Sequence, residues 1–173
     1  MAARTAFITG ATGFIGQHIL EQLTMRGWTV TALHRPGADD EPLVRYHATP
    51  AEGDLRDADS LHRAMPASVD AVFHCAASTS VWSRRDAQQW RVNVEGTRNL
   101  LTAARARGAG RVIHTSTWNV HAPERQATIH EDSPRLGRES RIGYNRSKQA
   151  AEEAVRAAVA DGLDAVILNP GHV

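Results

Sequence analysis

The sequence predicts an α/β fold, in which about six parallel strands form a doubly wound sheet with helices on both faces. Short apolar runs recur along the chain, and segments with helical periodicity separate them. Strands that alternate with helices in this way form parallel pairs joined by right-handed crossovers. At 173 residues, the chain is long enough to bury one core as a single domain.

The expected elements follow one another from the N-terminus. We expect strands at 6–8, 28–33, 70–77, 111–115 and 164–168, with a less well patterned strand within the polar segment 38–53. We expect helices at 17–23, 57–65, 86–107 and 144–161. Gly27, Gly108 and Gly162 each follow a helical segment, where glycine is a common helix terminator.

The composition is that of an ordinary globular protein and excludes several classes of function. The net charge of +1 provides no broad field that would attract nucleic acid or a membrane surface. No apolar run is long enough to span a membrane, and no signal peptide is apparent, so we expect a cytoplasmic protein. Cys75 is the only cysteine, and the nine histidines lack metal-ligand spacing, so we expect neither a disulfide nor a metal site.

A glycine-rich turn follows the first strand, with the sequence Thr9-Gly10-Ala11-Thr12-Gly13-Phe14-Ile15-Gly16. Three spaced glycines allow a tight bend, close approach of a phosphate to the backbone, and contact between helix and strand. The following helix start offers free N–H groups and a positive dipole end to a pyrophosphate. The pattern predicts a Rossmann-type sheet with strand order 3-2-1-4-5-6, whose dinucleotide site includes Gly10, Thr12, Gly13, Phe14, Ile15 and Gly16. The alternative is a glycine-rich turn without a ligand.

Arg35 stands at the end of the second strand, where such folds meet the adenosine ribose. An acidic residue there binds a free 2′-hydroxyl, whereas an arginine accommodates a 2′-phosphate. No carboxylate occurs between this strand and Asp39, so NADP(H) is favoured over NAD(H); the alternative is an exposed loop arginine. After the fourth strand, the small residues Ala76 and Ala77 would let the cofactor lie close to the backbone.

Tyr144 and Lys148 lie four residues apart at the start of a predicted helix and therefore share one face. Lys148 is the only lysine beside nineteen arginines, which suggests a position that a guanidinium cannot fill. A neighbouring ammonium lowers the pKa of a phenol toward the working range of a proton donor. A hydroxyl from Ser116 or Thr117 could then bind a substrate oxygen beside Tyr144.

These motifs, taken together, resemble the extended branch of the short-chain dehydrogenase/reductase superfamily. The NAD-dependent epimerase/dehydratase proteins, and the dihydroflavonol reductase-like ones among them, are the most similar group. The resemblance covers nearly the whole chain in order, and the matching motifs are Thr9-Gly10-x-x-Gly13-x-x-Gly16, Asp54-Leu55-x-Asp57, His74-x-Ala76-Ala77, Asn93-Val94-x-Gly96-Thr97, Thr115-Ser116-Thr117, Tyr144-x-x-Ser147-Lys148 and Asn169-Pro170-Gly171.

The resemblance implies roles for individual residues. It implies that Tyr144 is the catalytic acid/base and that Lys148 tunes it while binding the nicotinamide ribose. It aligns Thr117 with the catalytic Ser/Thr and Asn93 with a structural or relay asparagine. The remaining cofactor contacts that it implies are made by Asp54 and Leu55 near the adenine and by Pro170 on the nicotinamide side.

The resemblance also implies features of the whole protein. Extended members have a longer C-terminal part that supplies most of the substrate pocket, so we expect residues 1–173 to be the NAD(P)-binding domain and the substrate-binding region to be absent. We expect hydride transfer between NADPH and a carbonyl or hydroxyl of a small molecule. The alternatives are a nucleotide-sugar epimerase or dehydratase with retained NAD, and a non-catalytic dinucleotide-binding regulator. In the family, the helices near 86–107 and 144–161 pair in a homodimer.

Overall fold

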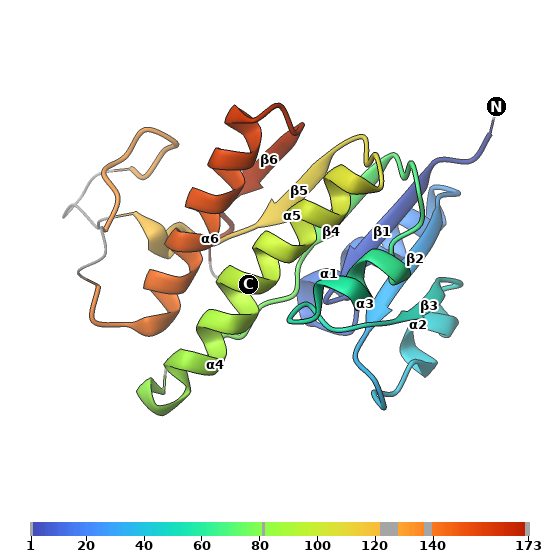
Figure 1. The fold of residues 1–173 in the computed structure, drawn as a ribbon, viewed down its shortest axis with the longest axis horizontal. Coiled ribbons are helices and arrows are strands. Elements are labelled where there is room, and N and C mark those ends of the chain that lie inside the picture. Colours follow the sequence, from blue (N-terminus) through green and yellow to red (C-terminus); the bar gives the residue numbers. More distant parts are fainter. Residues whose placement is uncertain (1, 81, 122–127, 137–139, 172–173) are drawn as a thin grey trace.

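Six parallel strands form one sheet in the predicted order β3-β2-β1-β4-β5-β6 (Figure 1). A computed structural model describes residues 2–80, 82–121, 128–136 and 140–171. The strands are β1 (Thr5–Thr9), β2 (Thr29–His34), β3 (Thr49–Glu52), β4 (Ala71–His74), β5 (Val112–Thr115) and β6 (Ala165–Leu168). The strand order reverses between β1 and β4, and this switch point places a crevice beyond the carboxyl ends of the two strands.

Helices cover the sheet unequally. On one face, α1 packs against β1 and β2, and on the other face α3, α5 and α6 lie side by side (Figure 1). The helices are α1 (Phe14–Met25), α2 (Glu41–Arg45), α3 (Ala58–Ala64), α4 (Asp86–Trp90), α5 (Gly96–Ala106) and α6 (Gly143–Ala160). The doubly wound arrangement predicted from the sequence is therefore confirmed.

Strand alternation divides the core into two layers. Phe7, Val72 and Val112 point from β1, β4 and β5 toward Leu100 of α5 and Val155 of α6, and all five are fully buried. The second layer lies under α1 and contains Ala6, Ile8, Leu20, Leu23, Val30 and Ala32. Because side chains alternate along a strand, neighbouring residues of β1 contribute to opposite layers.

Two elements differ from the sequence prediction. The polar segment before β3 contains α2, where the carboxylate of Asp39 accepts a hydrogen bond from the Glu41 backbone at 3.0 Å and Leu43 is completely buried. The helix expected at 86–107 is instead α4, a π-helical turn at Arg91–Glu95, and α5. Both features depend on local hydrogen bonding that hydrophobic periodicity does not report.

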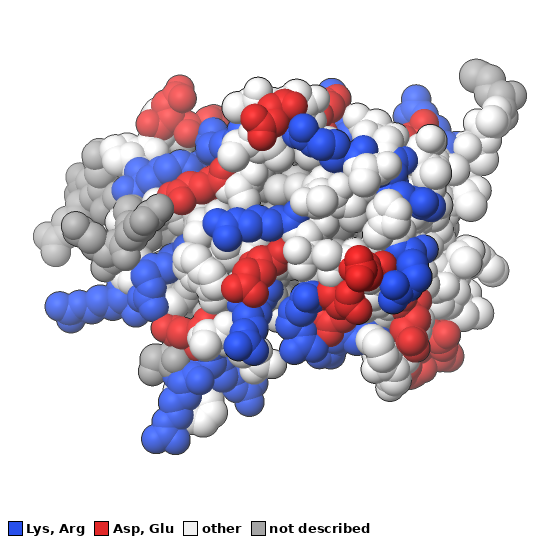
Figure 2. Space-filling view, in the orientation of Figure 1, with Lys and Arg blue, Asp and Glu red and all other residues white. Residues whose placement is uncertain are grey.

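The outer surface carries charges of both signs. On the face that Figure 2 shows, acidic and basic side chains are interspersed over most of the surface. None of the helices in the described ranges combines the length and apolar character that crossing a bilayer requires.

Candidate active site

The glycine turn connects β1 to α1 and is pressed against the end of β4. Gly10 adopts a positive φ of 73°, and a Cβ there would lie 2.5 Å from the Ala76 backbone nitrogen. A Cβ at Gly16 would collide with the carbonyl oxygen of Gly10. These two glycines are therefore required by the packing of the turn, as the spacing predicts.

The start of α1 fits a pyrophosphate. Gly13 is the N-cap, and it provides no side-chain cap for the first helical N–H groups, which have no acceptor within the helix. A 12-residue helix also directs its positive dipole end to this point. Thr12 is exposed beside the turn, whereas Phe14 is 66% exposed and stacks edge-on against His18, with ring centroids 4.9 Å apart. Phe14 and Ile15 can therefore contact a phosphate through their backbone.

A polar cavity of about 400 Å³ lies beyond the ends of β2 and β3. Arg35, Asp54 and Arg56 line it together with Pro36, Gly37 and Ala38. The guanidinium of Arg56 binds both carboxylate oxygens of Asp54, at 2.5 to 3.1 Å. Arg56, helped by the more distant charge of Arg35, holds the pKa of Asp54 below its ordinary value. Because the Asp54 carboxylate offsets the charge of Arg56, Arg35 is the residue that gives this cavity the positive charge that a phosphate would need.

Other predicted cofactor residues take different positions. Ala76 and Ala77 follow β4 and are partly exposed at the switch point, where Ala76 adjoins Gly10. Pro170 follows β6, and its carbonyl accepts a hydrogen bond from the Trp118 backbone at 3.1 Å. Leu55, by contrast, is only 7% exposed and packs in the core. The Leu55 side chain therefore belongs to the core, and a contact with the adenine would have to come from the backbone of this residue.

Thr117, Tyr144 and Lys148 meet beyond the carboxyl end of β5. The Thr117 hydroxyl lies close enough to the phenol of Tyr144 to influence its pKa, and Lys148 Nζ donates to the Thr115 carbonyl at 2.7 Å. Tyr144 is half-buried, whereas Lys148 is only 3% exposed. The structure therefore brings together the three side chains that the sequence assigned to the chemistry.

The sequence predicted that the ammonium of Lys148 lowers the pKa of the Tyr144 phenol, and this prediction is wrong. Burial raises the pKa of Tyr144, and the opposing influence is the hydrogen bond from Thr117. Burial also lowers the pKa of Lys148 from 10.5 to about 8, although the nearby Glu152 carboxylate acts in the opposite direction and raises it. The Lys148 ammonium is directed to the Thr115 carbonyl. Thr117 is the group that acts to lower the pKa of Tyr144.

Asn93 lies in the π-helical turn and is 2% exposed. Its amide accepts from the Ser78 backbone nitrogen at 2.7 Å and donates to the Ser78 carbonyl and the Ser147 hydroxyl, both at 2.9 Å. These contacts join the segment after β4 to α6. Asn93 therefore holds the segment after β4 in place relative to α6. A relay role for Asn93 stays a prediction.

Two histidines lie buried beneath the site, with ring centroids 5.2 Å apart. His74 contacts the hydroxyls of Thr9 and Thr97 at 2.8 and 2.9 Å, and burial lowers its pKa to about 3. Burial also lowers the pKa of His114 well below its ordinary value. Both rings are neutral near pH 7, which leaves Tyr144 as the better placed proton donor.

Residues that the sequence reasoning missed surround these groups. Arg56 is the variable position of the Asp54-Leu55-x-Asp57 motif, and Glu152 is completely buried on α6, four residues after Lys148. Helical i, i+4 spacing could have identified Glu152 as a neighbour of Lys148. No cluster of three or more potential metal ligands occurs among the residues that the structure describes.

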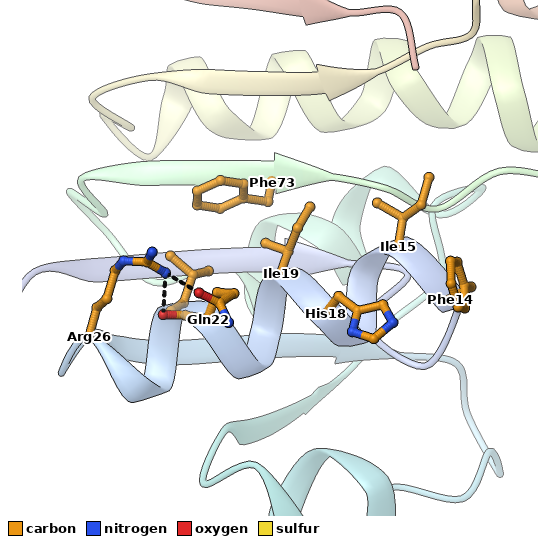
Figure 3. Close-up of a pocket in the computed structure, with 8 residues that line it drawn as sticks. Phe14, Ile15, His18, Ile19, Gln22, Arg26 and Phe73 are labelled. Carbon is orange, nitrogen blue, oxygen red and sulfur yellow. Dashed lines mark hydrogen bonds between the residues drawn. The ribbon is translucent and has the colours of Figure 1, made fainter. Parts of the chain in front are cut away.

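A second hollow, of about 460 Å³, lies beside α1 and is almost entirely apolar. Figure 3 shows Ile15 and Ile19 pointing from α1 toward the strand that carries Phe73, with Arg26 bonded to Gln22 at the far end. This hollow lies on the face of the sheet opposite α6. It is therefore separate from Thr117, Tyr144 and Lys148.

Comparisons with known proteins show the family of this chain. A sequence model described as "NAD dependent epimerase/dehydratase family" matches residues 6–173. A Synechocystis protein assigned provisionally as a dihydroflavonol 4-reductase is 34% identical over 95% of this chain and 48% of its own length. The 2-alkyl-3-oxoalkanoate reductase of Stenotrophomonas maltophilia is 34% identical over 94% of this chain and 49% of its own.

Solved structures show the same fold. The UDP-glucose 4-epimerase of Thermus thermophilus, in complex with NAD, is 29% identical, with a TM-score of 0.82 over 95% of this chain and 54% of its own. The chain spans about half the length of the relatives that it matches.

Proposed function

We infer the function of this chain from its family, because it belongs to the NAD dependent epimerase/dehydratase family of extended short-chain dehydrogenases/reductases. We propose that it forms the cofactor-binding and catalytic part of an NADP(H)-dependent oxidoreductase. When bound, the nicotinamide supplies or accepts the hydride. Tyr144 gives a proton to the substrate oxygen in the reductive direction, and Thr117 holds that oxygen. The observation that carries the proposal is that Thr117, Tyr144 and Lys148 lie together at the same edge of the sheet as the open N-terminus of α1.

The raised pKa of Tyr144 supports the reductive direction. Near neutral pH the phenol keeps its proton, so it is ready to donate to a carbonyl oxygen as the hydride arrives at the carbon. Reductases among the relatives, including the 2-alkyl-3-oxoalkanoate reductase, fit this assignment.

The second candidate is epimerisation or dehydration of a nucleotide sugar with retained NAD. Its support is the likeness to UDP-glucose 4-epimerase, and it would use the same three side chains. A non-catalytic dinucleotide-binding regulator is the third candidate, and it would need the glycine turn but no proton donor.

Arg35→Asp tests the cofactor assignment. A hydrogen bond to a charged group contributes about 1.5–3 kcal/mol, so loss of a 2′-phosphate contact should weaken NADPH binding roughly 10- to 100-fold. Binding of NADH should weaken by no more than about 3-fold, because NADH has no 2′-phosphate to lose and an acidic residue at this position can bind its free 2′-hydroxyl. Fluorescence titration of both reduced cofactors measures the two affinities.

Arg63→Asp is the matched control, because it makes the same change of charge at an exposed position of α3. Its NADPH affinity should stay close to that of the unaltered protein. Equal weakening of NADPH and NADH by Arg35→Asp would contradict the 2′-phosphate assignment. Tight binding of NADH with weak binding of NADPH by the unaltered protein would favour the second candidate.

We propose that the substrate pocket is completed by residues outside these 173. Phe73, Ile113 and Val166 occupy matching positions on β4, β5 and β6, so they share one face of the sheet. Val166 is 38% exposed, and Leu168 on the same strand face is 50% exposed. An apolar sheet face of this kind is normally covered by another element.

We also propose a homodimer formed through the outer surfaces of α4, α5 and α6. Trp90 and Val159 expose apolar side chains there, to 40% and 44%. Val159→Arg should shift the protein from dimer to monomer in sedimentation equilibrium, because a charge would be buried without a partner. Val44→Arg, a change at a 55% exposed residue of α2, should leave the dimer intact. A monomeric unaltered protein would contradict this proposal.

A further inference from the structure

The most completely buried charge in the described part of the chain is a carboxylate with no assigned role. Glu152 has an exposed fraction of 0% and lies on α6, one turn beyond Lys148. A buried carboxylate is strongly unfavourable unless other groups compensate its charge and occupy its oxygens. The identity of those groups indicates what the carboxylate holds in place.

One carboxylate oxygen of Glu152 connects to the backbone of Thr117 through a single amide. Asn169 Nδ2 donates to Glu152 Oε1 at 2.6 Å and to the Thr117 carbonyl at 3.0 Å. Asn169 directly follows β6, and Thr117 follows β5. The amide thus connects three separate elements at the edge of the sheet where Tyr144 lies.

The other oxygen of Glu152 contacts Arg135, in the segment 128–136. Arg135 Nη2 lies 2.5 Å from Glu152 Oε2, in an ion pair rather than an aligned hydrogen bond, and Arg156 lies farther away, at 3.9 Å. Arg135 pairs with His121 in an isolated β-bridge, so the ion pair fixes the residues around Arg135 against the segment that begins at Thr117. Both carboxylate oxygens of Glu152 therefore act on the position of the same segment.

We propose that Glu152 is a positioning residue, which places the Thr117 hydroxyl against Tyr144 by holding Asn169. The inference rests on the proposed function, which assigns Thr117 and Tyr144 to the chemistry. Neither Glu152 nor Asn169 touches the reacting atoms in this assignment. Loss of either residue should release the Thr117 backbone and move the Thr117 hydroxyl relative to the phenol.

The chain offers a direct probe of the surroundings of the Tyr144 phenol, because it contains only two tyrosines, Tyr46 and Tyr144. In a Tyr46→Phe background, tyrosine labelled with ¹³C at Cζ gives a single NMR signal, that of Tyr144. Its chemical shift responds to the hydrogen bond at the phenolic oxygen. Thr117→Val, which removes only the hydroxyl, defines the signal of the broken bond.

We expect Glu152→Ala and Asn169→Ala to move this signal in the direction of the Thr117→Val signal. Glu152→Gln keeps an oxygen for Asn169, so its signal should stay near that of the Tyr46→Phe protein. Asn169 is exposed, so its alanine variant tests the connection even if Glu152→Ala does not fold. In turnover, the two alanine variants should lower kcat by about 10²-fold, as a displaced catalytic group does, with little change in cofactor affinity.

An unmoved signal in Asn169→Ala would overturn the proposal, as would a Glu152→Gln signal displaced as far as that of Glu152→Ala. A moved signal with unchanged kcat would also overturn it, because Thr117 would then be held without consequence for the reaction. The spectra need neither cofactor nor substrate. A protein that fails to bind NADPH would therefore refute the proposed function, while the spectra still decide whether Glu152 holds Thr117.

Discussion

Tyr144→Phe should lower kcat by about 10²–10⁴-fold, the usual contribution of a general acid that is lost. The substitution removes one oxygen atom from a half-buried ring and leaves the apolar contacts of that ring in place. The variant should therefore fold normally and bind NADPH with an affinity within a few-fold of the unaltered protein. Oxidation of NADPH in the presence of a carbonyl compound that the unaltered protein reduces measures the loss.

Tyr46→Phe is the matched control, since it makes the same chemical change at the other tyrosine. Among its described contacts, the Tyr46 hydroxyl accepts a hydrogen bond only from the Gln17 amide, at 3.5 Å. Tyr46 ends α2 and is far along the chain from α6, which carries Tyr144. Its kcat should remain close to that of the unaltered protein. If Tyr144→Phe kept most of the activity, another group would have to donate the proton, and the assignment of Tyr144 would fail.

The sequence could predict the fold because each signal is local. The Gly10–Gly16 turn, the apolar runs and the helix terminators mark the boundaries of alternating strands and helices, and the alternation itself determines a parallel sheet. The spacing of Tyr144 and Lys148 also sufficed to place both on one helical face. These inferences need no knowledge of which distant residues meet.

Other features depend on contacts between distant parts of the chain. The link from Glu152 through Asn169 to Thr117 spans residues that only the finished sheet brings together. The same holds for Lys148, whose ammonium is directed to the Thr115 carbonyl because the end of β5 lies beneath α6. Spacing along one helix identifies neighbours on that helix and therefore suggested a Lys148–Tyr144 effect, whereas burial dominates the pKa of both groups.

Lys148→Met should make the protein more stable at pH 7, and it should also lower turnover, because the nicotinamide ribose contact that the family resemblance assigns to Lys148 is lost. Burial lowers the pKa of Lys148 from 10.5 to about 8, and one pKa unit corresponds to about 1.4 kcal/mol, so holding the charged ammonium in the fold costs roughly 3 kcal/mol. Methionine fills similar space without the charge but loses the bond to the Thr115 carbonyl. The expected net gain in the free energy of unfolding is roughly 1–2 kcal/mol.

The pH dependence separates this effect from simple repacking. Between about pH 8 and 10.5, the unfolded chain retains the Lys148 proton and the folded chain has lost it, so the free energy of unfolding of the unaltered protein rises with pH over this window. Below about pH 8 both forms carry the proton, and the cost is fully present. Urea unfolding at pH 7 and pH 10 should therefore show a large stability difference between Lys148→Met and the unaltered protein at pH 7 and a small one at pH 10.

Arg98→Met is the control for loss of a positive charge, because Arg98 is exposed on α5. Its unfolding free energy should differ from that of the unaltered protein by no more than about 0.5 kcal/mol at either pH. A Lys148→Met protein that is less stable at pH 7 would show that the ammonium holds the fold together. The expected result instead assigns Lys148 to function, because a buried charge that destabilises the fold is retained only where the site needs it.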